Sequence, residues 1–123
     1  MQFTSSKVNH IHTASFYKDV TFSNESVVIT PMMDSTFGKE IRIAFREGQV
    51  MKNHKTKFPI TVMTLQGSIE FSVGEEMFIL SEGDMISLEG NTMHALKATQ
   101  KSVVRLSLHK SDSEERVKGV LNL

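Results

Sequence analysis

Two histidines, His54 and His94, are the residues of this 123-residue chain best suited to chemistry. Each lies in a block that begins with glycine: GQVMKNHKTKFPITVMTLQG starts at Gly48, and GDMISLEGNTMHALKA starts at Gly83. The chain contains no cysteine, so any metal must be held by imidazole, carboxylate or neutral oxygen. A catalytic divalent ion commonly takes three protein ligands and keeps an open position, and two imidazoles fall short of that number. The residues alone therefore predict a weak metal site at His54 and His94, or none.

The residues around these histidines predict an apolar binding wall. Alternate positions on a strand share one face, and this parity places Thr56, Ile60, Val62 and Thr64 on the same side as His54. We assign Leu96, two residues after His94, to the same wall. The sequence thus predicts that a small molecule contacts these five side chains.

Other residues could add to the site. His10 and His12 alternate, so on one strand face they could supply ligands to their own barrel or to a partner's; the alternative is that both face solvent. His109 ends the last predicted strand and is expected to be solvated. Three lysines flank His54 and either attract an anionic ligand or form a solvated face: Lys52, Lys55 and Lys57.

Composition limits the class of protein. Lys plus Arg and Asp plus Glu number 14 each, so the basic excess typical of nucleic-acid binding is absent, and we expect no nucleic-acid partner. The longest apolar run, residues 77–80, is far too short to span a bilayer, so no membrane partner is expected. The first residues show no signal-peptide pattern, which predicts a cytoplasmic protein.

The chain length predicts a single domain, residues 1–123. Its core is expected at about residues 38–110, with a strand or arm over residues 1–25 and a short helix or tail over residues 111–123. Ser111 and Glu114 have the spacing of a capping box, which favours a helix over residues 112–118.

Apolar residues recur at period two between glycines, and this pattern predicts an all-β fold. Gly74 and Glu75 suit the two central positions of a type II′ hairpin turn, and Pro31 and Pro59 are expected at strand ends. Strands are predicted at residues 26–30, 40–46, 59–66, 68–73, 76–80, 84–88, 94–98 and 102–109.

The two glycine-led blocks resemble the two motifs of the cupin superfamily. The first family motif reads Gly, five residues, His, one residue, His, three or four residues, Glu, six residues, Gly; Gly48, His54 and Gly67 occupy its positions. The second begins Gly-Asp and carries a later histidine, matched by Gly83, Asp84 and His94. The resemblance covers about residues 38–110, extends to small bacterial single-domain cupins, and implies a double-stranded β-helix, the jelly-roll barrel. It also implies about ten strands in two facing sheets, with a homodimer as the common assembly.

This sequence departs from the family pattern at the metal ligands. The resemblance implies two histidines and a glutamate from the first motif and one histidine from the second, but Thr56 and Ile60 replace two of these four. In the second motif, Glu89, Asn91 and Ala98 stand where proline, glycine and asparagine are usual. The metal site is therefore degenerate, with at most one weakly held divalent ion such as zinc, nickel, iron or manganese.

Three functional hypotheses follow. The first is a non-redox, small-molecule-binding cupin of unassigned ligand, acting as a sensor or accessory protein. The alternative is a metal-dependent cupin enzyme, a dioxygenase, isomerase or lyase on a small acid or sugar derivative, which needs a third ligand that the sequence does not identify. The third is an inert dimerisation module. Eight methionines suit either a loosely defined apolar cavity or the filling of a core or dimer interface.

Overall fold

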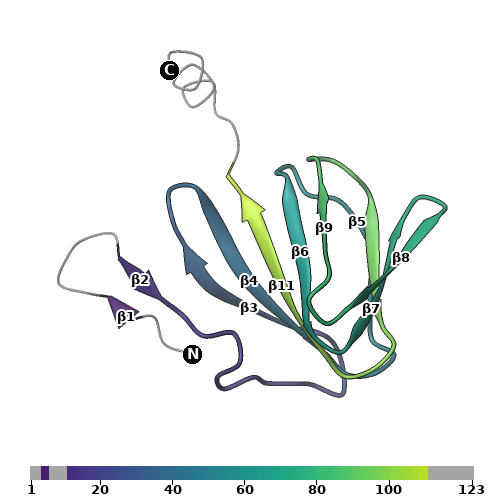
Figure 1. Ribbon diagram of the computed structural model, residues 1–123, viewed down its shortest axis with the longest axis horizontal. Coiled ribbons are helices and arrows are strands. Elements are labelled where there is room, and N and C mark those ends of the chain that lie inside the picture. The colour runs from purple at the N-terminus through teal and green to yellow at the C-terminus, as the bar shows by residue number, and fades with distance from the viewer. Residues whose placement is uncertain (1–3, 6–10, 111–123) are drawn as a thin grey trace, which may run out of the picture.

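The computed structural model describes residues 4–5 and 11–110, and the predicted helix at residues 112–118 lies outside the described residues. Strands make up the regular structure of this part of the chain, which folds as two facing antiparallel sheets (Figure 1). Within the same residues there is no helix with the length and apolar character needed to cross a membrane. The predicted all-β jelly-roll architecture is confirmed.

The first sheet has four strands in the order β5-β10-β7-β8, and the second has five in the order β3-β4-β11-β6-β9. A separate two-stranded ribbon pairs β1 with β2 near the amino terminus. The strand bounds are β1 Thr4–Ser5, β2 His12–Thr13, β3 Val28–Asp34, β4 Gly38–Phe45, β5 Val50–His54, β6 Ile60–Gln66, β7 Ser68–Val73, β8 Glu76–Ser81, β9 Met85–Leu88, β10 His94–Ala98 and β11 Ser102–His109.

Most predicted strands are confirmed to within two residues, but three differences have physical causes. The strand expected over residues 26–30 extends to Asp34, and Pro31 lies inside it rather than at its end. This is tolerated because β3 is an edge strand with a bulge between Pro31 and Met33. The strand β5 was not predicted because a bulge breaks it, and β1 and β2, each two residues long, fall within the strand or arm expected over residues 1–25.

The hairpin between β7 and β8 has the predicted two-residue turn. Val73 pairs with Glu76, so Gly74 and Glu75 are the central residues of the turn. Gly74 has φ 60°, and Glu75 is not among the residues with positive φ, as a type II′ turn requires. This turn fixes the register of β8, and with it which β8 side chains face the barrel interior.

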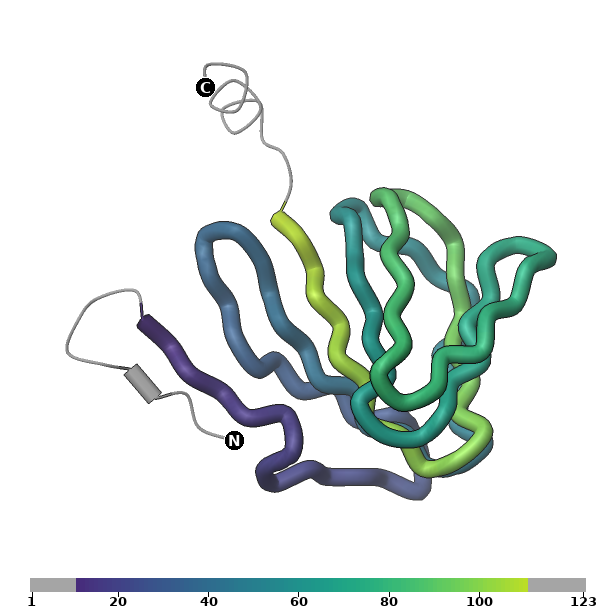
Figure 2. The backbone as a smooth tube through the Cα atoms, viewed as in Figure 1, coloured from purple at the N-terminus to yellow at the C-terminus, as the bar shows by residue number. Residues whose placement is uncertain are grey.

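The core lies between the two sheets. Alternate residues of each strand enter it, and the largest fully buried side chains include Phe45 and Phe71, each 0% exposed. The smooth trace in Figure 2 shows the two sheets facing each other, and β8 and β9 are edge strands, one of each sheet.

Residues 14–24 cross the outer face of the five-stranded sheet before β3 begins. Arg42, 2% exposed on β4, donates hydrogen bonds to the backbone carbonyls of Phe16, Lys18 and Asp19 at 3.3, 2.9 and 3.2 Å. The Gln49 side-chain amide donates to a further carbonyl of this segment, that of Ser23, at 2.7 Å. Polar side chains of the barrel thus attach this segment to its own sheet.

Candidate functional site

His54 and His94 come together at one end of the barrel. They are Cα partners on β5 and β10, and their ring centroids are 4.3 Å apart with an interplanar angle of 58°. A bulge on β5 causes this meeting. His94 pairs with His54 and Leu96 pairs with Met51, so two positions along β10 correspond to three along β5. Without the extra residue, strict alternation would direct His54 and Met51 to opposite faces of the sheet.

Backbone hydrogen bonds orient both rings. The Nδ1 atom of His54 lies 2.7 Å from the Lys52 carbonyl oxygen, and that of His94 lies 2.9 Å from the Thr92 carbonyl oxygen. A carbonyl only accepts, so Nδ1 carries a proton in each ring and donates it, and in a neutral ring the lone pair is then on Nε2. A carbonyl bound to the second nitrogen is also how proteins orient metal-ligating histidines.

Burial favours the neutral form of His94. The side chain is 3% exposed and stacks on Phe71, with centroids 5.5 Å apart and rings within 4° of parallel. Loss of solvation lowers the pKa of His94 below its ordinary 6.5; the Thr92 carbonyl opposes this shift and the neighbouring His54 adds to it. A neutral imidazole with a lone pair at Nε2 can accept a hydrogen bond or a metal.

The other residues that the structure describes do not add a third ligand to the histidine pair. Among residues 4–5 and 11–110, no three His, Cys, Asp or Glu side chains are grouped closely enough to hold an ion. At the two positions where the family ligands are missing, Thr56 donates its hydroxyl proton to the Phe58 carbonyl at 2.8 Å, and Ile60 is apolar. The pair thus supplies two of the three protein ligands that a catalytic ion usually takes, and metal binding here stays a prediction.

The residues predicted to contact a ligand divide into two groups. Ile60, Val62 and Leu96 are at most 3% exposed and belong to the central hydrophobic cluster, where they pack against other core side chains. Thr64 is fully buried, and its hydroxyl has no hydrogen-bond partner. Thr56, two residues after His54 in the sequence, is half-buried. Their contact with a ligand stays a prediction.

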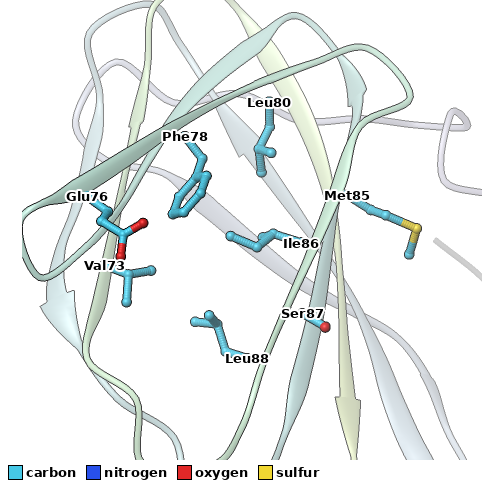
Figure 3. Close-up of a pocket in the computed structure, with 8 residues that line it drawn as sticks. All are labelled: Val73, Glu76, Phe78, Leu80, Met85, Ile86, Ser87 and Leu88. Carbon is cyan, nitrogen blue, oxygen red and sulfur yellow. The ribbon is translucent and has the colours of Figure 1, made fainter.

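An open pocket lies elsewhere, between the edge strands β8 and β9 (Figure 3). Its volume is about 430 Å³, within the range of roughly 300–1,000 Å³ typical of small-molecule sites. The side chains that face one another across it are Val73, Glu76, Phe78, Leu80, Ile86 and Leu88, whereas Met85 and Ser87 point away. The pocket is thus apolar apart from one carboxylate.

This pocket and the histidine pair lie toward the same end of the barrel. Ser72 pairs with Ala95, the residue after His94, and Val73 pairs with Glu76 at the neighbouring hairpin. Sequence reasoning missed the pocket, although one signal was available. Glu76, Phe78 and Leu80 alternate along β8, so the hairpin register already placed them on the inner face.

The other candidate residues do not line the pocket. His12 is exposed on β2, and His10 falls outside the described residues. His109 is exposed at the end of β11, where its Nε2 lies 3.0 Å from the Thr61 hydroxyl. The three lysines near His54 are all exposed. Among the methionines that the structure describes, Met32 is fully buried and Met51 packs against the hydrophobic cluster, whereas Met85, the one methionine lining the pocket, points out of it.

Comparisons with solved structures identify the fold. An RmlC-like cupin from Desulfovibrio desulfuricans superposes with a TM-score of 0.75 at 19% identity, over 81% of this chain and 97% of the other. An RmlC-like cupin from Shewanella frigidimarina gives a TM-score of 0.70 at 13% identity, over 94% of this chain and 99% of the other. A cupin superfamily protein from Desulfitobacterium hafniense gives 0.69 at 12% identity, over 75% and 84%. The chain has the cupin fold.

No family model and no curated relative matches the sequence. The cupin assignment therefore rests on the superposition together with details of the motifs. Asn91, which stands at a cupin motif glycine, has φ 64°, a left-handed conformation that asparagine tolerates better than most residues. Its backbone N–H donates to the Thr56 carbonyl at 2.6 Å, joining the first motif to the second.

Proposed function

We propose that this cupin-fold protein binds a small, largely apolar molecule between β8 and β9, as a non-redox sensor or accessory protein. The pocket between these strands carries the proposal, because it combines a suitable volume with apolar walls and an opening to solvent. The interior around Ile60 and Val62 is filled by packed side chains, which favours the pocket as the point of entry.

The proposal is tested by titrating the protein with 4-phenylbutanol, a neutral probe with an apolar body, and following backbone amide signals by NMR. We expect saturable shifts confined to β8, β9 and the end of β7. Phe78→Asp places a charge on the inner face of β8 and should weaken binding at least about tenfold, because the probe loses apolar contact and the carboxylate must be desolvated.

Ile79→Asp is the matched control, since Ile79 is on the opposite face of the same strand and is 53% exposed. It should leave the affinity within about twofold of the parent protein. Equal losses in the two variants, or no saturable shifts in the parent protein, would contradict the proposed site.

A second candidate is the metal-dependent enzyme, favoured by the convergence of His54 and His94 with both Nδ1 atoms held by carbonyls. Elemental analysis of the untagged protein, after reconstitution with zinc, nickel, iron or manganese, separates the two. Our proposal predicts substoichiometric metal. A near-stoichiometric ion that is lost in the His54→Ala, His94→Ala double variant would favour the enzyme.

A further inference from the structure

We propose that Glu76 makes the pocket between β8 and β9 selective for apolar molecules with a protonated amine. This inference rests on the proposed function, since it specifies the ligand class of the same pocket. Figure 3 shows the Glu76 carboxylate directed into the pocket beside Val73 and below Phe78. It is the one ionisable side chain among the eight residues that line the pocket.

The position of Glu76 in the hairpin explains why its carboxylate faces the pocket. Glu76 opens β8 and shares its face with Phe78 and Leu80, both of which line the pocket. Met77 and Ile79 occupy the opposite face and are 55% and 53% exposed. Glu75 is next in sequence but lies in the turn and does not line the pocket. One hairpin therefore places two adjacent carboxylates in different surroundings.

The Glu76 carboxylate has no cationic neighbour in the part of the chain that the structure describes. The ion pairs there join Arg105 to Glu40 and Lys110 to Asp34, both away from the pocket, and no side-chain hydrogen bond involves Glu76. A ligand ammonium would be the first cation to pair with it. The surrounding apolar walls exclude part of the water that would screen such a pair.

A ligand that satisfies this pocket has two parts. An aryl or alkyl body packs against Phe78, Leu80, Ile86 and Leu88, and an ammonium at one end reaches Glu76 at the rim. A carboxylate in place of the ammonium is repelled by the same residue, and a hydroxyl is neither attracted nor repelled by its charge. Because Glu76 is exposed, the preference for amine over alcohol should be about fivefold, the upper range for a partly solvated ion pair.

The experiment compares three probes with the same body: 4-phenylbutylamine, 4-phenylbutanol and 4-phenylbutyrate, each titrated near neutral pH. We expect the amine to bind about fivefold tighter than the alcohol, and the carboxylate to bind more weakly than either. Glu76→Gln should remove the preference while leaving the affinity for the alcohol within about twofold. Glu75→Gln, the matched control, should leave the preference intact.

The outcomes separate this inference from the proposed function. If the alcohol binds in the pocket and the amine binds no tighter, the selectivity is wrong and the proposed function stands. If Glu75→Gln reduces the preference as much as Glu76→Gln, the general negative charge of the hairpin is responsible, and the inference is overturned. If no probe binds, the proposed function fails first.

Discussion

Replacing Gly67 by alanine should destabilise the protein far more than the same change at Gly83. Gly67 is the single residue between β6 and β7, which belong to opposite sheets, and it has φ 88°. A Cβ atom at this position would overlap the Ser102 hydroxyl and the Lys101 carbonyl oxygen, and would lie 2.8 Å from the Ser102 Cα. Ser102 is 1% exposed and cannot move aside without breaking its hydrogen bonds to Ser68 and Gln100.

Gly83 isolates the conformational part of this cost. Its φ is 90°, nearly that of Gly67, but a Cβ there would have no atom within 4 Å. Gly83→Ala should therefore cost only the strain of a left-handed alanine, about 1 kcal/mol. Gly67→Ala adds steric overlap with backbone and should cost about 3–5 kcal/mol in total.

The free energy of unfolding of both variants is measured by urea unfolding. Circular dichroism follows the transition, because a chain with no tryptophan and one tyrosine gives little intrinsic fluorescence. The dependence of the free energy of unfolding on urea concentration should keep the slope of the parent protein if only the folded state is strained. Free energies of unfolding that differ by less than about 0.5 kcal/mol between the two variants would refute the steric argument.

Two further predictions concern buried ionisable side chains. Because burial lowers the pKa of His94, the unfolded chain binds a proton at a higher pH than the folded one, so stability should fall as pH drops below about 6.5, by at most about 1.4 kcal/mol per pH unit. Urea unfolding of the metal-free protein between about pH 5 and 8 should show this dependence weakened in His94→Gln, and an unchanged pH profile would contradict it. Arg42→Met leaves three carbonyls without their donor, and should cost about 2–4 kcal/mol and speed amide exchange in residues 14–24. Arg46→Met, at an exposed site, is its control, and equal effects would refute the attachment role of Arg42.

The sequence was sufficient to predict the fold class because two kinds of local signal agree. Alternation of apolar residues specified most strands, and glycines at the motif positions specified where the chain must turn sharply. Gly67 shows the physical basis of one such position, since its left-handed backbone and the closeness of Ser102 both exclude a side chain. Asn91, at a motif position where glycine is usual, has φ 64°, a left-handed conformation that asparagine tolerates better than most residues.

The pairing of His54 with His94 was only half predictable. Motif spacing indicated both residues, but β5 was not recognised as a strand, because the bulge that turns His54 inward also breaks the alternation on which recognition depends. Strand pairing across residues 40 positions apart then decides that the rings lie 4.3 Å from each other.

The sequence by itself indicated most strands and the sharp turns between them. It also identified the two candidate histidines and the replacement of two family ligands by Thr56 and Ile60. Only the tertiary structure decided where space remains for a ligand. Side-chain parity marks Ile60 and Val62 as inward-facing, but whether inward residues line a cavity or fill it depends on how closely the two sheets pack. They pack closely around those residues and separate between β8 and β9, which places the open pocket, with Glu76 in its wall, at the sheet edges.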